Sequence, residues 1–215
     1  MNTVYPEILA EQGFVVLALA YFKAPGLPAT LDEVPVETVS RALDFLEQHP
    51  EVDQRGGFGV LGVSRGSELA LLAGAYDQRI RAVAAIVPSS VAWHGQTGPA
   101  AWTVDAQPVN SLSFARRSEQ PILIRAQQAL STAPADRAQL PVERIGGPLL
   151  LISASQDHIW PSTAMARELV ERLEIHDFAY PVNHLILADD HSLNQRSVEQ
   201  IKQPLIELFS VLSAN

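Results

Sequence analysis

Apolar residues along the chain fall either in short continuous runs or at spacings of three and four positions. The runs predict strands buried on both faces, and the spaced residues predict helices with one apolar face. Strands are predicted over residues 14–21, 58–63, 80–87, 149–153 and 178–182. Helices are predicted over residues 4–12, 36–46, 69–76, 165–173 and 205–212, with Pro204 opening or kinking the last. This alternation predicts an α/β fold with a mostly parallel sheet and helices on both faces.

Residues 91–147 break the alternation, because they are rich in Pro, Gly, Ser and Gln. The stretch is too long for a plain connection, so it is predicted to form a cap or lid. The length of 215 residues suits one domain, and no internal repeat divides it. We therefore expect residues 1–215 to form a single domain with a cap insertion at residues 91–147.

The most informative motif is Gly62-Val63-Ser64-Arg65-Gly66, a G-x-S-x-G pentapeptide between a predicted strand and a predicted helix. In this context the motif indicates a nucleophile elbow, a sharp turn that pushes a serine hydroxyl out of the sheet. Its two glycines allow the backbone to turn without side-chain clashes. A strand-to-helix turn without chemistry is the alternative interpretation.

An acid and a histidine are expected after later strands of such a fold, in the chain order Ser, Asp or Glu, His. Asp157 follows the predicted strand at residues 149–153, and His184 follows the run at residues 178–182. The sequence therefore predicts a catalytic triad of Ser64, Asp157 and His184. The histidine would accept the serine proton, and the aspartate would hold the imidazole tautomer.

Other histidines and acids compete for these roles. His191 would replace His184 if the last strand ran longer than predicted. His158 adjoins Asp157 in the chain and is poorly placed to be oriented by it. Asp177 precedes the last predicted strand and is expected in a solvated loop. The remaining histidines are expected on the surface or in the cap, namely His49, His94 and His176.

Composition narrows the possible partners. The formal net charge of −9 argues against a broad surface for nucleic acid or anionic membrane. The chain has no cysteine, so disulfides, thiolate metal sites and a cysteine nucleophile are excluded. The apolar run at residues 14–22 is too short to span a membrane and has no basic leader before it. A cytoplasmic protein is the simplest interpretation.

Several segments carry signatures more specific than the elbow. They are residues 17–22, 27–28, 62–71, 89–95, 140–145, 156–162 and 180–186. Together they resemble the C-terminal α/β-hydrolase domain of the type I acyl-CoA thioesterases, which are related to bile acid-CoA:amino acid N-acyltransferase. The resemblance places the family's triad on Ser64, Asp157 and His184, the same residues that the positional search selects.

The resemblance implies hydrolysis of fatty acyl-CoA to free acid and CoA through an acyl-serine, with no cofactor or metal. Relatives that transfer acyl groups to amines use cysteine where this chain has Ser64, so water is the expected acceptor here. A small-ester or dienelactone-type hydrolase is an alternative with the same triad, and an inactive scaffold is another. In the predicted cap, Arg116, Arg117 and Arg125 are either contacts for CoA phosphates or solvated surface charges.

The chain departs from the family in two places. Leu187-Ala188-Asp189-Asp190 replaces a proline-rich motif after the family's histidine. Early strands of the hydrolase sheet and a glycine-rich loop that donates one oxyanion N–H are expected to be missing. The backbone N–H of Arg65 is then the expected oxyanion donor. The uncharged strand predicted at residues 14–21 would be exposed, which predicts a possible homo-oligomer through it.

Overall fold

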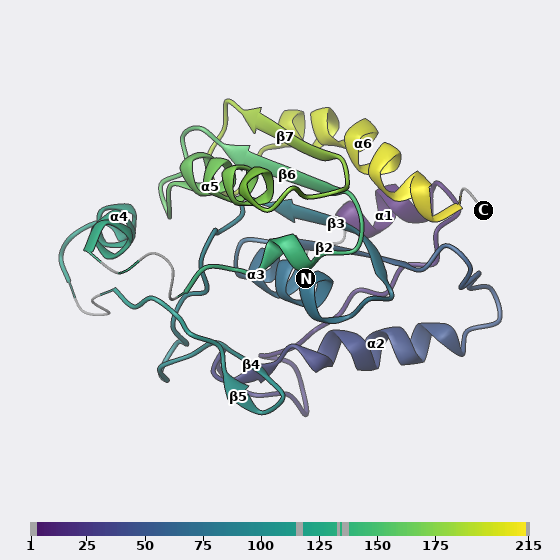
Figure 1. Cartoon of the computed structure of the whole chain (residues 1–215), viewed down its shortest axis with the longest axis horizontal. Coiled ribbons are helices and arrows are strands. Elements are labelled where there is room, and N and C mark those ends of the chain that lie inside the picture. The colour runs from purple at the N-terminus through teal and green to yellow at the C-terminus, as the bar shows by residue number, and fades with distance from the viewer. Residues whose placement is uncertain (1–3, 115–117, 133, 135–137, 214–215) are drawn as a thin grey trace.

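The computed structural model describes residues 4–114, 118–132, 134 and 138–213. Its centre is a four-stranded parallel sheet in the order β2-β3-β6-β7 (Figure 1). The strands are β2 Phe58–Val63, β3 Ile80–Ile86, β6 Leu149–Ala154 and β7 Val182–Leu187. Because all four run in one direction, their carboxyl ends meet at one edge, where ligands bind in sheets of this kind.

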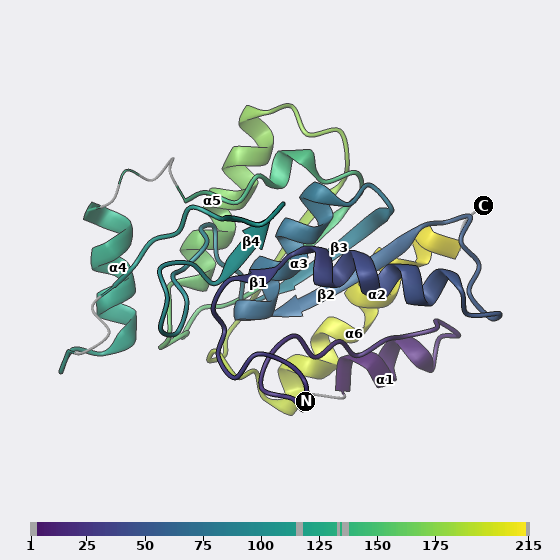
Figure 2. The same ribbon diagram turned by 90° about the horizontal axis from the view of Figure 1, so that it is seen from below.

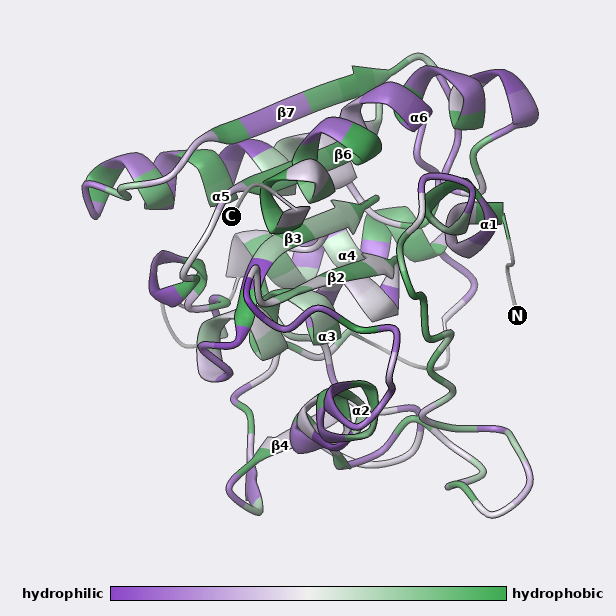
Figure 3. Cartoon of the chain, turned by 90° about the vertical axis from the view of Figure 1, so that its right-hand side faces the viewer, coloured by the Kyte–Doolittle hydropathy of each residue, from purple (hydrophilic) through white to green (hydrophobic). Residues whose placement is uncertain are grey.

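Helices cover both faces of this sheet (Figure 2). One face carries α1 Val4–Ala10 and α6 Gln195–Ser210, and the other carries α2 Glu37–Glu47, α3 Arg65–Tyr76 and α5 Ser162–Ile175. Alternate residues of β3 serve the two cores: Ala84 and Ile86 lie with α1 and α6, and Val83 and Ala85 lie with α3 and α5. In Figure 3, α5 and α6 carry both purple and green stretches, as expected for helices with one face on a sheet. The predicted α/β fold is confirmed.

A second, smaller sheet and one helix lie outside the central sheet. All of their residues except those of the first strand of the small sheet come from the stretch between β3 and β6. The sheet has the order β1-β4-β5, made of β1 Val34–Pro35, β4 Trp102–Val104 and β5 Gln107–Pro108. Helix α4, Ile122–Thr132, stands away from the central sheet in both Figure 1 and Figure 2. Among the described residues, 3-10 helices are η2 Val142–Arg144 and η3 Val211–Ser213.

The prediction of a strand over residues 14–21 is wrong. This segment, the green trace that follows α1 in Figure 3, has no regular secondary structure. Phe14 packs with the core under α1 and α6, whereas Leu19 and Tyr21 pack with the core that includes α2 and α3. Apolar side chains of the segment therefore contact both cores, but its backbone pairs with no strand of the described sheet, so its apolar composition does not lead to strand pairing.

The last strand begins four residues later than predicted, at Val182 instead of residue 178. Phe178 and Tyr180 contact each other edge to face, with ring centroids 5.4 Å apart, and precede the strand. Pro181, the residue just before the strand, accepts a hydrogen bond from Leu149 N, the first residue of β6. The final helix also differs, because Pro204 lies inside α6 and does not open it. No helix among the described residues is long and apolar enough to cross a membrane.

Candidate active site

Ser64 lies on the turn between β2 and α3, at the carboxyl edge of the sheet. Its backbone has φ 55° and ψ −122°, a region that costs a non-glycine residue on the order of 1–3 kcal/mol. Two contacts hold it there: Ser64 N donates to Ile86 O at 2.9 Å, and Ser67 Oγ donates to Ser64 O at 2.6 Å. The sharp turn expected of a nucleophile elbow is therefore present.

The two glycines of the elbow differ in importance. A Cβ atom built on Gly62 would lie 2.0 Å from Gly66 O, a distance that excludes any side chain. A Cβ atom on Gly66 would meet only the Tyr21 hydroxyl at 3.4 Å, an ordinary contact. Gly62 is thus required by the close approach of α3 to β2, and Gly66 is not required by space.

His191 connects Ser64 to Asp157. His191 Nδ1 lies 2.9 Å from each carboxylate oxygen of Asp157, and His191 Nε2 lies 2.8 Å from Ser64 Oγ. Since a carboxylate only accepts hydrogen bonds, Nδ1 carries the proton and Nε2 accepts from the serine hydroxyl. The three side chains form the arrangement in which a histidine removes a serine proton and an aspartate stabilises the resulting cation.

Asp157 lies in the loop between β6 and α5 and is almost fully buried. Its Oδ1 atom also accepts hydrogen bonds from Ile159 N at 2.9 Å and Trp160 N at 3.2 Å. Burial raises the pKa of Asp157, but hydrogen bonds from His191, Ser162 and the Ile159 N–H outweigh it, so the pKa lies below its ordinary value. Asp157 is therefore an anion suited to face an imidazole.

The assignment of the triad histidine to His184 is wrong. His184 lies inside β7, opposite Leu151 of β6, and its Nε2 atom is hydrogen-bonded to Ser153 Oγ at 2.8 Å. Burial, assisted by the charge of Arg167, lowers the pKa of His184 and favours a neutral imidazole. The cause of the error is the strand boundary: because β7 extends to Leu187, the residue that follows the strand at the site is His191.

The loop that carries His191 is fixed by two aspartates. The Asp189 carboxylate accepts hydrogen bonds from Asp190 N at 2.8 Å and Asn194 N at 2.7 Å. The Asp190 carboxylate accepts from His191 N and contacts His158 Nδ1 on the acid loop. The sequence signal for this loop is the polar run Asp189-Asp190-His191 directly after an apolar strand. The family resemblance leads one to expect a proline-rich motif at these positions, so it does not point to His191.

A buried ion pair lies beneath the elbow. Arg65 Nη1 contacts Glu68 Oε1 at 3.1 Å, and Glu68 Oε2 accepts from Trp102 Nε1 at 2.8 Å and Trp93 N at 3.2 Å. The Glu68 side chain is fully buried; burial raises its pKa, and Arg65 and the two tryptophan donors oppose that rise. Arg65 Nη2 also donates to His94 O at 3.2 Å. The network anchors the segment after β3 to the first turn of α3.

The sequence matches the model of a protein family described as BAAT / acyl-CoA thioester hydrolase C terminal, over residues 34–190. This match extends over more than half of the chain. The chain belongs to this family.

Curated members of the family are similar to the chain over most of its length. Acyl-coenzyme A thioesterase 2, mitochondrial, of Rattus norvegicus is 34% identical over 79% of the chain and 37% of its own length. Acyl-coenzyme A amino acid N-acyltransferase 1 of Mus musculus is 32% identical over 84% of the chain and 44% of its own length. The chain thus spans less than half the length of these relatives.

Solved structures share the fold at low identity. Porphyromonas gingivalis dipeptidyl peptidase 4 superposes with a TM-score of 0.52 at 14% identity, covering 84% of this chain and 22% of that chain. Pyrococcus horikoshii acylaminoacyl peptidase superposes with a TM-score of 0.52 at 14% identity, covering 81% of this chain and 26% of that chain. Both likenesses show the α/β-hydrolase fold that the family resemblance implies.

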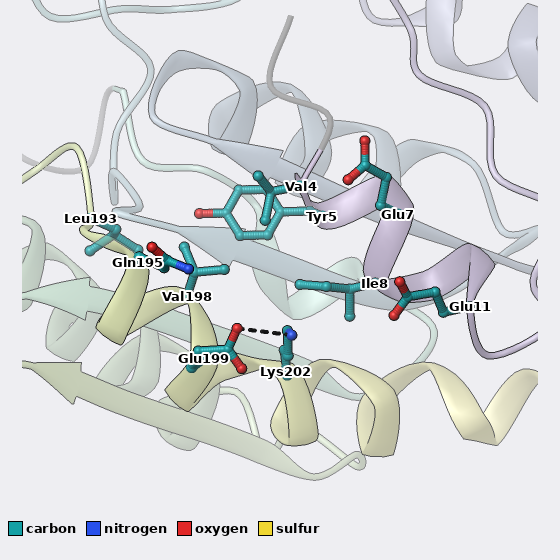
Figure 4. A pocket seen from close by; sticks show the side chains of 10 residues that line it. All are labelled: Val4, Tyr5, Glu7, Ile8, Glu11, Leu193, Gln195, Val198, Glu199 and Lys202. Atoms are coloured by element: carbon teal, nitrogen blue, oxygen red, sulfur yellow. Dashed lines mark ion pairs between the residues drawn. The ribbon is translucent and has the colours of Figure 1, made fainter.

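A pocket of about 450 Å³ lies between α1 and α6 (Figure 4). Glu7 and Glu11 of α1 line it, together with an ion pair on α6 in which Lys202 Nζ lies 2.9 Å from Glu199 Oε1. Leu193, two positions after His191, is also in its wall. Three carboxylates against one ammonium make the lining acidic, which disfavours anionic ligands.

Proposed function

We propose that this chain is a serine hydrolase that cleaves fatty acyl-CoA to a free acid and CoA through an acyl-serine intermediate. The observation that carries the proposal is the 2.8 Å contact between Ser64 Oγ and His191 Nε2, with Asp157 behind the imidazole. Membership of a family whose relatives are named acyl-coenzyme A thioesterases supports the thioester as the bond attacked.

In the first half of the reaction, His191 Nε2 takes the Ser64 proton while Oγ attacks the thioester carbonyl carbon. The carbonyl oxygen becomes an oxyanion beside the backbone N–H of Arg65, the first residue of α3. A helix N-terminus carries partial positive charge, so this N–H suits the role. As the intermediate collapses, the carbon–sulfur bond breaks, and His191 returns the proton to the departing CoA sulfur.

In the second half, water replaces CoA. His191 takes a proton from water, whose oxygen attacks the acyl-serine carbonyl, and a second oxyanion forms at the same N–H. Collapse breaks the bond to Ser64 Oγ, which recovers its proton from His191. Because the intermediate is an oxygen ester, it is less activated than the thioester of a cysteine enzyme, so hydrolysis is favoured over transfer to an amine.

We also propose that residues 91–147 form a cap beside the site. Trp93 and Phe114 of this stretch belong to one apolar cluster with Trp160, the residue whose ring contacts His191. Arg125 of α4 lies over the Phe114 ring, with its Cζ atom 5.3 Å from the ring centre. This contact places Arg125 next to the apolar cluster that includes Trp160, so we propose Arg125 as a contact for CoA phosphates. Arg116 and Arg117 lie outside the described residues. The acidic pocket between α1 and α6 is unsuited to those phosphates.

The testing experiment measures CoA release from a fatty acyl-CoA by the chain and by Ser64→Ala. The proposal expects release by the first and none by the second, and equal rates would contradict it. Faster turnover of short aryl esters without CoA release would favour the small-ester or dienelactone-type alternative. Failure of folded protein to react with a fluorophosphonate at Ser64 would favour an inactive scaffold. A cytoplasmic location stays a prediction, since one relative's name places it in mitochondria.

A further inference from the structure

Trp160 contacts two members of the Ser64, His191 and Asp157 set, although it carries no group of its own for the reaction. Its backbone N–H donates to Asp157 Oδ1 at 3.2 Å. Its indole ring meets the His191 imidazole edge to face, with centroids 5.3 Å apart and planes at 81°. The side chain is only 4% exposed. One residue therefore touches both the acid and the base.

The indole is itself fixed at its polar end. Trp160 Nε1 donates to Val87 O at 3.2 Å, at the residue that follows β3. Val87 has φ 42°, an unusual value for a β-branched residue, and its N–H is bonded to Ile152 O. Its chain neighbour Ile86 accepts the hydrogen bond from Ser64 N. The strained end of β3 thus connects the elbow to the indole through two consecutive carbonyl groups.

The indole is also fixed on its apolar face. Trp93 stacks on Trp160, with ring centroids 6.5 Å apart and planes at 12°. Trp93 is 1% exposed and packs in turn against Phe114. The stacking contact with Trp93 and the hydrogen bond to Val87 O both oppose turning of the Trp160 ring. The His191 ring therefore packs against a rigid surface.

We propose that Trp160 is the positioning residue that sets the plane of the His191 imidazole. Rotation about the axis through the imidazole Cβ and Cγ atoms would move Nδ1 away from Asp157 and Nε2 away from Ser64 Oγ. The Asp157 hydrogen bond opposes this rotation at one edge of the ring, and the edge-to-face contact with Trp160 adds a second restraint on the plane of the ring. Proton transfer needs donor and acceptor within hydrogen-bond reach, so the contact acts on the rate of chemistry more than on substrate binding. The inference rests on the proposed hydrolase function.

The test compares Trp160→Phe, which keeps an aromatic ring, with Trp160→Met, which fills space without one. The proposal expects the methionine variant to lose roughly 10- to 100-fold in kcat with KM little changed, because small misplacements of catalytic groups have effects of this size. The phenylalanine variant should recover most of that loss. Trp160→Leu serves the same purpose if the methionine variant does not fold.

Phe209→Leu is the matched control, since Phe209 is a buried aromatic residue packed on Gly59 at the opposite end of β2. It should lower the melting temperature without changing kcat. The rate of Ser64 labelling by a fluorophosphonate gives a second readout, so absence of acyl-CoA turnover would count against the proposed substrate and not against Trp160. Wild-type kcat and labelling in folded Trp160→Met, or an equal loss in Trp160→Phe, would overturn the inference.

Discussion

His191 Nε2 lies 2.8 Å from Ser64 Oγ, although 127 positions separate the two residues in the chain. Ser64 follows the edge strand β2, and His191 follows β7 at the other edge of the four-stranded sheet. Parallel strands bring both loops to the same edge, where Asp157 after β6 lies beside the imidazole. The topology of the sheet therefore assembles the site from three distant segments.

The buried pair Arg65–Glu68 predicts a large stability effect. Glu68→Ala removes a fully buried carboxylate and leaves Trp93 N and Trp102 Nε1 without their acceptor. Loss of one partner of a buried ion pair lowers the free energy of unfolding by about 3–5 kcal/mol, and partial exposure of Arg65 puts this site toward the lower end. Denaturant unfolding monitored by circular dichroism measures the change.

The Lys202–Glu199 pair offers a matched control, because it has the same i,i+3 spacing on α6 but is exposed. Glu199→Ala should leave the unfolding midpoint unchanged, as expected of a solvent-screened pair. A similar loss in both variants would show that burial of Glu68 is not the source of its effect.

The low pKa of Asp157 predicts an acid-dependent contribution to stability. Since its folded pKa lies below the ordinary value of 3.8, the carboxylate stabilises the folded state above that pH. The contribution is lost as the pH falls through the folded pKa. The difference in melting temperature between wild type and Asp157→Asn should therefore be larger at about pH 6 than at about pH 3. A difference independent of pH would contradict this, and Asp105→Asn on the exposed turn after β4 is the control.

The apolar surface on the segment before Tyr21 predicts self-association. Val15, Val16 and Leu17 are 36–38% exposed and follow one another without a charge. A contiguous apolar surface of this kind favours contact with a second copy. Sedimentation velocity should show a dimer or larger species that Val16→Lys shifts toward monomer. Ile175→Lys, at an isolated exposed residue of α5, should not shift it. A wild-type monomer at all concentrations would contradict the prediction.

The alternation of strands and helices is predictable from the sequence because apolar periodicity reports burial: β3 and β6 are almost wholly buried, and β2 is a partly buried apolar run. Ser64 and Asp157 lie on the loops after β2 and β6, as the sequence predicts, because those two strands are readable as apolar runs. The triad histidine is mispredicted because residues 178–181 have the apolar composition of a strand, although the strand itself begins only at Val182. Strand ends depend on hydrogen bonds with a neighbour, and composition does not report those.

The wrong prediction of a strand over residues 14–21 has a similar cause. Their composition is that of a buried strand, yet the segment pairs with no strand of the described sheet and leaves Val16 at the surface. Glu68 carries no sequence signal of burial, because an acidic residue in the first turn of a helix ordinarily faces solvent. Only the contacts with Arg65, Trp93 and Trp102 reveal its burial.

The most direct test of the central claim compares His191→Ala with His184→Ala in fluorophosphonate labelling of Ser64 and in CoA release from a fatty acyl-CoA. With His191 as the base, His191→Ala should slow both reactions by on the order of 10³-fold or more, as removal of a triad histidine does. His184→Ala should keep both, since its ring contacts Ser153. Loss of labelling and CoA release in folded His184→Ala, with both retained in His191→Ala, would contradict the account.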